Sequence, residues 1–165
     1  MTPLLSIDIL LIAVCAWLAI GLAGLAAPRN LRFVGKMLFP LGALVGVLTG
    51  LTSLAFLGGS AEVAVLAIGL PNLPFHLRLD NLTAVFALLV GMVSAGISVF
   101  AAGYFREGEG AAPGLMSLQY HFFLASMLMV LLADDAYAFM VAWEVMALSS
   151  FFLVTTDHKH AEIRR

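Results

Sequence analysis

Two titratable side chains lie inside long apolar stretches of the sequence, where few charged residues occur. Glu144 is the only charged residue between Asp135 and Asp157, and His121 lies in an uncharged run that ends at Asp134. A carboxyl group kept away from water favours its protonated form, and an imidazole has an unperturbed pKa of about 6.5. Both side chains could therefore take up and release protons, so the chemistry that we predict for them is proton transfer.

Glu144 has the stronger claim to a function. In a helix that begins near Ala136 it lies about 12 Å from the start, close to the middle of a hydrocarbon core about 30 Å thick. An isolated carboxylate there costs a few kcal/mol, so we expect Glu144 to face a protein interior or a water-filled cavity. The alternative is a protonated glutamate that bonds to a neighbouring helix and has no transport role. Residues that recur at steps of three and four lie on one face of a helix, and we predict that this face of the helix at 136–156 points inward. They are Tyr137, Met140, Glu144, Leu148, Phe151 and Thr155.

His121 has a simpler alternative role, because a histidine beside Tyr120 at a membrane interface can serve as an anchor. Asp134 and Asp135 form a short turn before the last apolar run. Negative charge is favourable at a helix N-terminus, so we interpret both aspartates as solvated caps.

Metal and cofactor sites are not expected. Cys15 is the only cysteine, and no pattern of cysteine and histidine ligands surrounds it. His158, Lys159 and His160 form a short basic tail that is better explained as a topology signal than as a set of metal ligands. A net charge of -2 provides no basic field for nucleic acid. We therefore expect no cofactor, no metal and no redox centre in this chain.

The composition indicates the elements that position these side chains. The 165 residues are 62% hydrophobic and 11% charged, with a mean hydropathy of +1.06. Soluble domains have about 25% charged residues, so this chain is predicted to lie in a bilayer. Its long runs with one charge or none predict an all-α membrane protein, a single membrane domain over 1–165 with five transmembrane helices. Their predicted ranges are 4–27, 36–57, 81–104, 115–133 and 136–156.

Basic residues predict the orientation of these helices. Seven of the eight fall on one side of the predicted helices, and only Arg78 falls on the other. The positive-inside rule therefore places the N-terminus outside and the C-terminus in the cytoplasm. The seven are Arg29, Arg32, Lys36, Arg106, Lys159, Arg164 and Arg165.

The connection between the second and third helices is long enough to form its own structure. Residues 62–68 and 75–79 flank a segment with glycine and proline, and apolar and polar residues alternate over 75–79. This period of two predicts a small β-hairpin on the outer face.

Small residues at four-residue spacing predict where helices approach closely. The second helix has Gly42, Gly46 and Gly50, and Pro40 could kink it near the inner end. The first helix has a weaker version of the pattern, in Cys15, Ala19, Ala23 and Ala27. We interpret both patterns as packing seams.

The segment 133–150, ADDAYAFMVAWEVMALSS, resembles the antiporter-like membrane subunits of respiratory complex I, energy-converting [NiFe] hydrogenases and Mrp-type antiporters. The Trp143-Glu144 pair and the residues after it look most like the large membrane subunit of hydrogenase-4 and formate hydrogenlyase. The segment 79–83, LDNLT, is similar to the lead into the third helix of those subunits, and Gly103-Tyr104 fits its exit.

The resemblance implies a multi-pass subunit of the inner (plasma) membrane. In that family the glutamate matched by Glu144 works with lysines of later helices in proton translocation that redox chemistry in partner subunits drives. The family has about fourteen helices, and no intramembrane lysine occurs here. The sequence thus favours an N-terminal fragment of a longer subunit, a split subunit or a decayed gene, which would leave Glu144 facing lipid in isolation.

Three functions remain open from the sequence. The first is a proton-translocating, non-catalytic subunit of a hydrogenase or NADH:quinone oxidoreductase-like complex, whose partners are the other membrane subunits. The second is an Mrp-type sodium/proton antiporter subunit. The third is a structural membrane scaffold with an inert Glu144.

Overall fold

A computed structural model of the protein describes residues 5–70, 72–104 and 112–155. The predictions for Arg106 and for the basic tail after 155 lie outside these residues. The elements, in chain order, are α1 (Ser6–Ala23), the 3-10 turn η1 (Gly24–Ala26), α2 (Leu31–Phe33), the π-helical turn η2 (Val34–Leu38), α3 (Phe39–Phe56), β1 (Glu62–Leu70), β2 (Leu73–Leu79), α4 (Asn81–Tyr104), α5 (Pro113–Leu132) and α6 (Ala136–Thr155).

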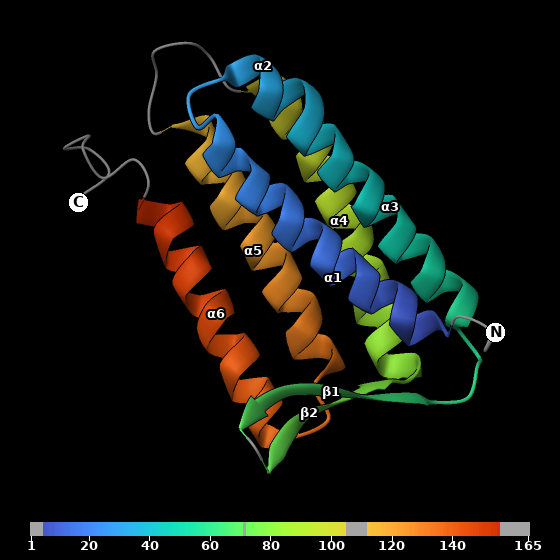
Figure 1. Cartoon of the computed structure of the whole chain (residues 1–165). Helices are drawn as coiled ribbons and strands as arrows, with labels where there is room; N and C mark the ends of the chain where they lie inside the picture. The colour runs from blue at the N-terminus through green and yellow to red at the C-terminus, as the bar shows by residue number, and fades with distance from the viewer. Residues whose placement is uncertain (1–4, 71, 105–111, 156–165) are drawn as a thin grey trace.

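The five helical segments lie side by side in a bundle (Figure 1). Within the described ranges, five helices are long and apolar enough to cross a membrane, from 20 to 26 residues each. α1 packs against α5 and α3, α3 packs against α4, and α5 packs against α6. The hairpin lies across one end of the bundle, and α2 lies at the opposite end. The predicted helices are confirmed, with boundaries that differ by a few residues.

The second membrane helix differs most from its predicted range, because it begins at Leu31. The side chain of Asn30 accepts a hydrogen bond from the Phe33 amide, which caps the helix start. A π-helical turn over Val34–Leu38 then precedes Pro40, and the Phe39 amide donates to the Val34 carbonyl. Proline supplies no N–H and crowds the carbonyl four residues earlier, so a wider turn relieves the conflict. Lys36 therefore lies inside the helix and does not begin it.

The hairpin has the two strands that the alternating pattern predicted, paired antiparallel from Glu62 opposite Leu79 to Leu70 opposite Leu73. Phe75, Leu77 and Leu79 are buried against the bundle, as a period of two requires. Leu77 also bridges to Ala133 at the end of α5. The sheet is therefore fixed to the end of the helices.

The seam predicted on the first helix is wrong. Cys15 and Ala19 are exposed in α1, so the predicted stripe faces away from its neighbours. The buried face is instead formed by larger side chains and two glycines: Ile7, Leu10, Ala13, Val14, Trp17, Gly21 and Gly24. Trp17 and Leu10 are fully buried in α1, which packs against α5 and α3, and their larger side chains make more van der Waals contacts than alanines would.

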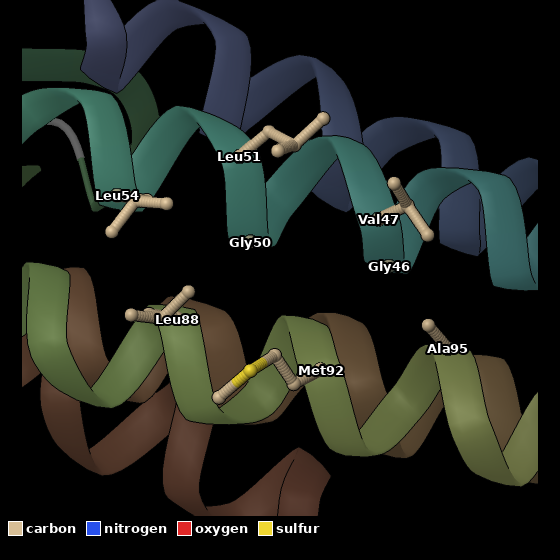
Figure 2. A pocket seen from close by; sticks show the side chains of 8 residues that line it. All are labelled: Gly46, Val47, Gly50, Leu51, Leu54, Leu88, Met92 and Ala95. Atoms are coloured by element: carbon tan, nitrogen blue, oxygen red, sulfur yellow. The ribbon is translucent and has the colours of Figure 1, made fainter.

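The glycine seam of the second helix is confirmed as a close-packing face: Gly46 and Gly50 face α4, whereas Gly42 faces His121 of α5. A Cβ atom built on Gly46 would lie 2.5 Å from the Ser94 hydroxyl and 3.0 Å from the Gly91 carbonyl oxygen. α4 supplies a matching stripe of small buried residues: Ala84, Ala87, Gly91, Ser94 and Ser98. Next to this contact lies an open apolar groove, into which Figure 2 shows Leu54, Leu88 and Met92 projecting. Close backbone contact, rather than interlocking large side chains, therefore holds α3 to α4.

Gly91 gives a direct test of this contact. A Cβ atom on Gly91 would lie 2.5 Å from the Gly50 amide nitrogen and 2.7 Å from the Gly46 carbonyl oxygen, whereas one on Gly96 meets nothing within 4 Å. Gly91→Ala should therefore force α3 and α4 apart and lower the free energy of unfolding by about 1–3 kcal/mol. Gly96→Ala, on the same helix, should change it by less than about 1 kcal/mol. Thermal unfolding in detergent micelles measures both, and equal effects would contradict the packing described.

Candidate functional site

Glu144 lies in the middle of α6, at the depth expected from the sequence, but its side chain is exposed. The predicted inward stripe is therefore wrong, since Met140, Leu148 and Phe151 are exposed with it. α6 lies at the edge of the bundle, beside α5 (Figure 1). Within this chain, Glu144 faces the surroundings of the bundle.

The face that α6 buries consists of small side chains. Ala138, Ala142 and Ser149 are the buried residues of the helix, and the Ser149 hydroxyl donates to the Val145 carbonyl of its own helix. Small residues let the α5 and α6 backbones approach, so the bulky residues turn outward. The sequence contained this signal in the spacing of Ala138, Ala142 and Ser149, which the choice of a stripe through Glu144 overlooked.

His121 is the opposite case, because it is fully buried at the centre of the bundle. Its Nδ1 atom lies 2.7 Å from the Ser117 carbonyl oxygen and 3.2 Å from the Ser117 hydroxyl. The carbonyl can only accept, so Nδ1 donates and Nε2 carries the lone pair. Among the described residues, Nε2 has no hydrogen-bond partner. It points at Gly42, where a Cβ atom would collide with it.

Three helices meet at this histidine. The Trp17 indole N–H of α1 donates to the Gly42 carbonyl of α3 at 3.3 Å, beside the imidazole of α5. The Phe39 ring of α3 lies 5.7 Å from the imidazole, centre to centre. His121 is fully enclosed by the protein, so its side chain cannot serve as an interfacial anchor and that interpretation is wrong. It sits in a junction that only a glycine at position 42 allows.

A second polar contact lies next to this junction, on the α4 side of α5. The Tyr120 hydroxyl donates to the Ser94 carbonyl at 3.1 Å and lies 3.0 Å from the Ser98 hydroxyl. Tyr120 and His121 are consecutive, so one points to α4 and the other to α1 and α3. Polar contacts thus lie on two sides of α5 inside the bundle.

The structure does not bring the two predicted proton-transfer residues together. His121 faces the interior from α5, whereas Glu144 is on the exposed side of α6. Among the described residues, no three acidic, histidine or cysteine side chains cluster in a way that could hold a metal ion.

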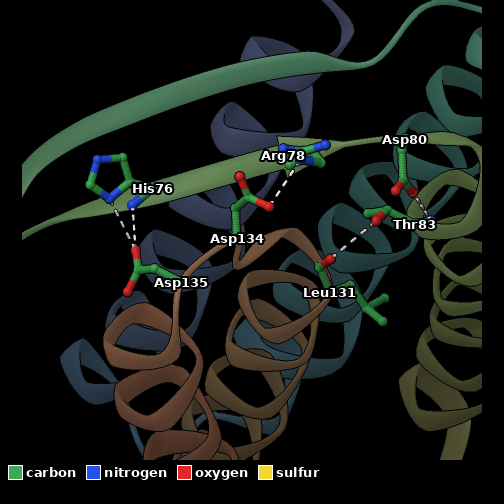
Figure 3. A network of polar contacts seen from close by, with 7 residues as sticks. All are labelled: His76, Arg78, Asp80, Thr83, Leu131, Asp134 and Asp135. Atoms are coloured by element: carbon green, nitrogen blue, oxygen red, sulfur yellow. Dashed lines mark hydrogen bonds and ion pairs between the residues drawn. The ribbon is translucent and has the colours of Figure 1, made fainter.

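A third set of polar contacts connects the hairpin to the turn between α5 and α6 (Figure 3). Asp135 accepts the Ala138 amide at 2.8 Å, as a helix cap, and also the His76 amide at 2.8 Å. Arg78 pairs with Asp134 at 2.9 Å. The cap on α6 was predicted, but the ion pairs to the hairpin were not. Their signal was the alternation that places His76 and Arg78 on the polar side of β2.

Backbone hydrogen bonds control the acidity of two aspartates at this end. The Ala138 and His76 amides, in that order of effect, hold the pKa of Asp135 below its usual range. The Thr83 amide, 2.8 Å from the carboxylate, lowers the pKa of Asp80 at the start of α4. Amides that donate to a carboxylate stabilise its ionised form. Both caps are therefore charged at neutral pH.

Acid should release the Asp135 cap. Because the pKa of Asp135 is lowered, the stability that its ionised cap contributes is complete above the usual pKa of about 4. This stability is lost as the pH falls through the lowered pKa. Amide NMR shifts of His76 and Ala138 should therefore titrate together below about pH 4. Asp135→Asn should abolish this titration, and Asp134→Asn, the matched control, should leave it unchanged. If the amide shifts that depend on Asp135 titrated at or above the usual aspartate pKa of about 4, the hydrogen bonds to its carboxylate would be contradicted.

Parts of this chain are similar to known proteins. Residues 66–112 match the family described as NADH-ubiquinone oxidoreductase (complex I), chain 5 N-terminus. This segment begins within β1 and includes β2 and α4, but it includes neither His121 nor Glu144.

Several curated proteins are similar over larger parts of the chain. Hydrogenase-4 component B of Escherichia coli is 38% identical over 47% of this chain and 12% of its own length. NADH-quinone oxidoreductase subunit L of Mycobacterium tuberculosis is 34% identical over 48% of this chain and 12% of its own. A putative antiporter subunit of Staphylococcus epidermidis is 26% identical over 59% of this chain and 13% of its own. The chain thus matches only a small part, about one eighth, of each of these relatives.

Proposed function

We propose that this chain is part of an antiporter-like membrane subunit, similar to those of complex I, hydrogenases and Mrp-type antiporters, and that it takes part in redox-driven proton translocation. The observation that carries the proposal is Glu144, a carboxyl group in the middle of an apolar membrane helix. The chain serves as a non-catalytic part of a hydrogenase or NADH:quinone oxidoreductase-like complex, and Glu144 is its proton relay.

The exposure of Glu144 supports a role within a larger assembly. A charged side chain at the bilayer centre costs about 2.5–3.5 kcal/mol on insertion scales, so such residues pair with other groups or face water. In the bundle, the face around Glu144 carries Met140 and Leu148, and both are exposed. We propose that another membrane-spanning helix, with a polar or basic group at the depth of Glu144, covers this face in the assembly.

His121 is the second residue of the proposed relay. Its Nε2 lone pair is a proton acceptor without a partner among the described residues, deep inside the bundle. Proton transfer between His121 and Glu144 would need water or side chains between the two helices, because the two residues point to different sides. We therefore assign His121 to a separate segment of the proton path.

The remaining chemistry belongs to partner subunits. Relatives include a hydrogenase component and a subunit of an NADH-quinone oxidoreductase. We propose that such partners hold the redox centres, and that the assembly lies in the inner (plasma) membrane with the hairpin on the outside.

A second candidate is an Mrp-type sodium/proton antiporter, which the similarity to a putative antiporter subunit favours. Transport in the redox-linked assembly should follow electron transfer and need no sodium. An antiporter should exchange protons for sodium without an electron donor.

The test is proton uptake by inverted membrane vesicles that contain the assembled complex. Glu144→Gln should reduce donor-driven uptake to a few per cent of wild type or less, because a positioned proton-transfer group contributes roughly 10²-fold or more. Electron transfer measured without a proton gradient should persist. Val154→Ala, an exposed residue of the same helix ten positions after Glu144, is the control and should keep normal uptake.

The outcomes separate the three functions. Normal uptake in Glu144→Gln would favour a scaffold with an inert glutamate, and sodium-dependent exchange without an electron donor would favour the antiporter. The purified chain in liposomes should conduct no protons by itself. A flux from the chain alone that Glu144→Gln abolishes would contradict the need for an assembly.

A further inference from the structure

Three cations lie together at the end of the bundle opposite the hairpin. Arg29, Arg32 and Lys36 are all exposed, at the start of the second membrane helix. We call them the basic patch. Arg32 and Lys36 are four residues apart, so they are neighbours on one side of the helix. Figure 1 shows α2, which contains Arg32, at this end of the bundle.

No carboxylate of the described residues balances this charge. The two ion pairs in these ranges, His76 with Asp135 and Arg78 with Asp134, are at the hairpin end. Apart from Glu144 within α6, the acidic residues described all lie at the hairpin end as well: Asp8, Glu62, Asp80, Asp134 and Asp135. Like charges at four-residue spacing destabilise a helix, and no carboxylate of the described residues offsets this cost for Arg32 and Lys36.

The surroundings of the patch have the chemistry of a membrane boundary. Below Lys36, toward the middle of the helix, the exposed side of the same helix is apolar, with Met37 at 54%, Leu41 at 46% and Leu44 at 64% exposed. Cations therefore stand directly next to an apolar helix face. A ligand that combines an anionic head with an apolar tail matches both parts.

We infer that the basic patch binds the headgroup of an anionic phospholipid, whose acyl chain lies along the apolar side of the second membrane helix. Arginine can donate two parallel hydrogen bonds to one phosphate, and lysine adds a point charge. Phosphate would relieve the repulsion between Arg32 and Lys36. The lipid thereby anchors this end of the bundle at the membrane surface. This site is independent of Glu144 and His121.

The test uses the full chain in phosphatidylcholine bilayers with spin-labelled lipids, read by electron paramagnetic resonance. The wild type should associate with phosphatidylglycerol more strongly than with phosphatidylcholine. Each removed cation should lower this preference up to about fivefold, which corresponds to about 1 kcal/mol for a Lys or Arg near an anionic surface. The variants are Arg32→Gln and Arg32→Gln/Lys36→Gln. Arg78→Gln, at the opposite end, is the control and should keep the preference.

Three results would overturn the proposal. The double variant could retain the wild-type preference, or Arg78→Gln could lose as much of it as the double variant does. The preference could also vanish when inorganic phosphate replaces chloride at equal ionic strength, which would assign the patch to a soluble phosphate. Folding of each variant is checked by circular dichroism. None of these results bears on proton uptake, so failure here leaves the proposed function untouched.

Discussion

The whole bundle depends on close contact between helix backbones at glycines. Lipid tails are as apolar as the side chains that face them, so no hydrophobic force draws the helices together in a bilayer. Contact must come from close packing, and here it comes at Gly46 with Gly91 and at Gly24 with Gly114. The second pair is reinforced by the Gly114 amide, which donates to the Pro28 carbonyl at 2.8 Å. These contacts fix the distances at which every other side chain must fit.

The same constraint determines where the two titratable residues lie. Gly42 leaves space for the imidazole of His121, so a polar ring is held at the centre of three helices. Between α5 and α6 the small residues Ala138 and Ala142 form the contact, which leaves Glu144 on the outer side. By contrast, the polar groups at the hairpin end have partners. Arg78 pairs with Asp134, and Asp80 and Asp135 cap helices. Glu144 is thus the one described carboxylate placed between the two ends of the bundle.

Much of the fold could be predicted from the sequence, because long uncharged runs and alternating residues are local signals. The five helices and the hairpin follow from them directly. The faces of the helices were harder to predict. The glycine seam at Gly46 was recognised, since glycines at four-residue spacing have few other roles, whereas Cys15 and Ala19 gave a false seam in α1. In a membrane helix both faces are apolar, so periodicity does not distinguish the protein side from the lipid side.

The types of Glu144 and His121 made them candidates in the sequence, but their surroundings in the fold could not be predicted from it. Glu144 was identified because it is a charge inside an apolar run. Whether its side chain is exposed depends on which face of α6 packs against α5. The buried environment of His121 depends on Gly42 and Trp17, which lie 79 and 104 residues earlier in the chain. Contacts of that range leave no local pattern in a single sequence. The alternation over β2 placed His76 and Arg78 on its polar side, but their partners Asp134 and Asp135 lie more than 50 residues away and could not be identified from that pattern.

We propose that another transmembrane helix covers the Glu144 face in the native assembly. A photo-cross-linking residue at Leu148, one turn from Glu144, tests it in native membranes by mass spectrometry of the products. The account predicts an adduct with a membrane-spanning peptide, in the same polypeptide or another, that carries a polar or basic residue near the cross-linked position. Adducts with lipid alone would contradict it, because Glu144 would then face the bilayer without a partner.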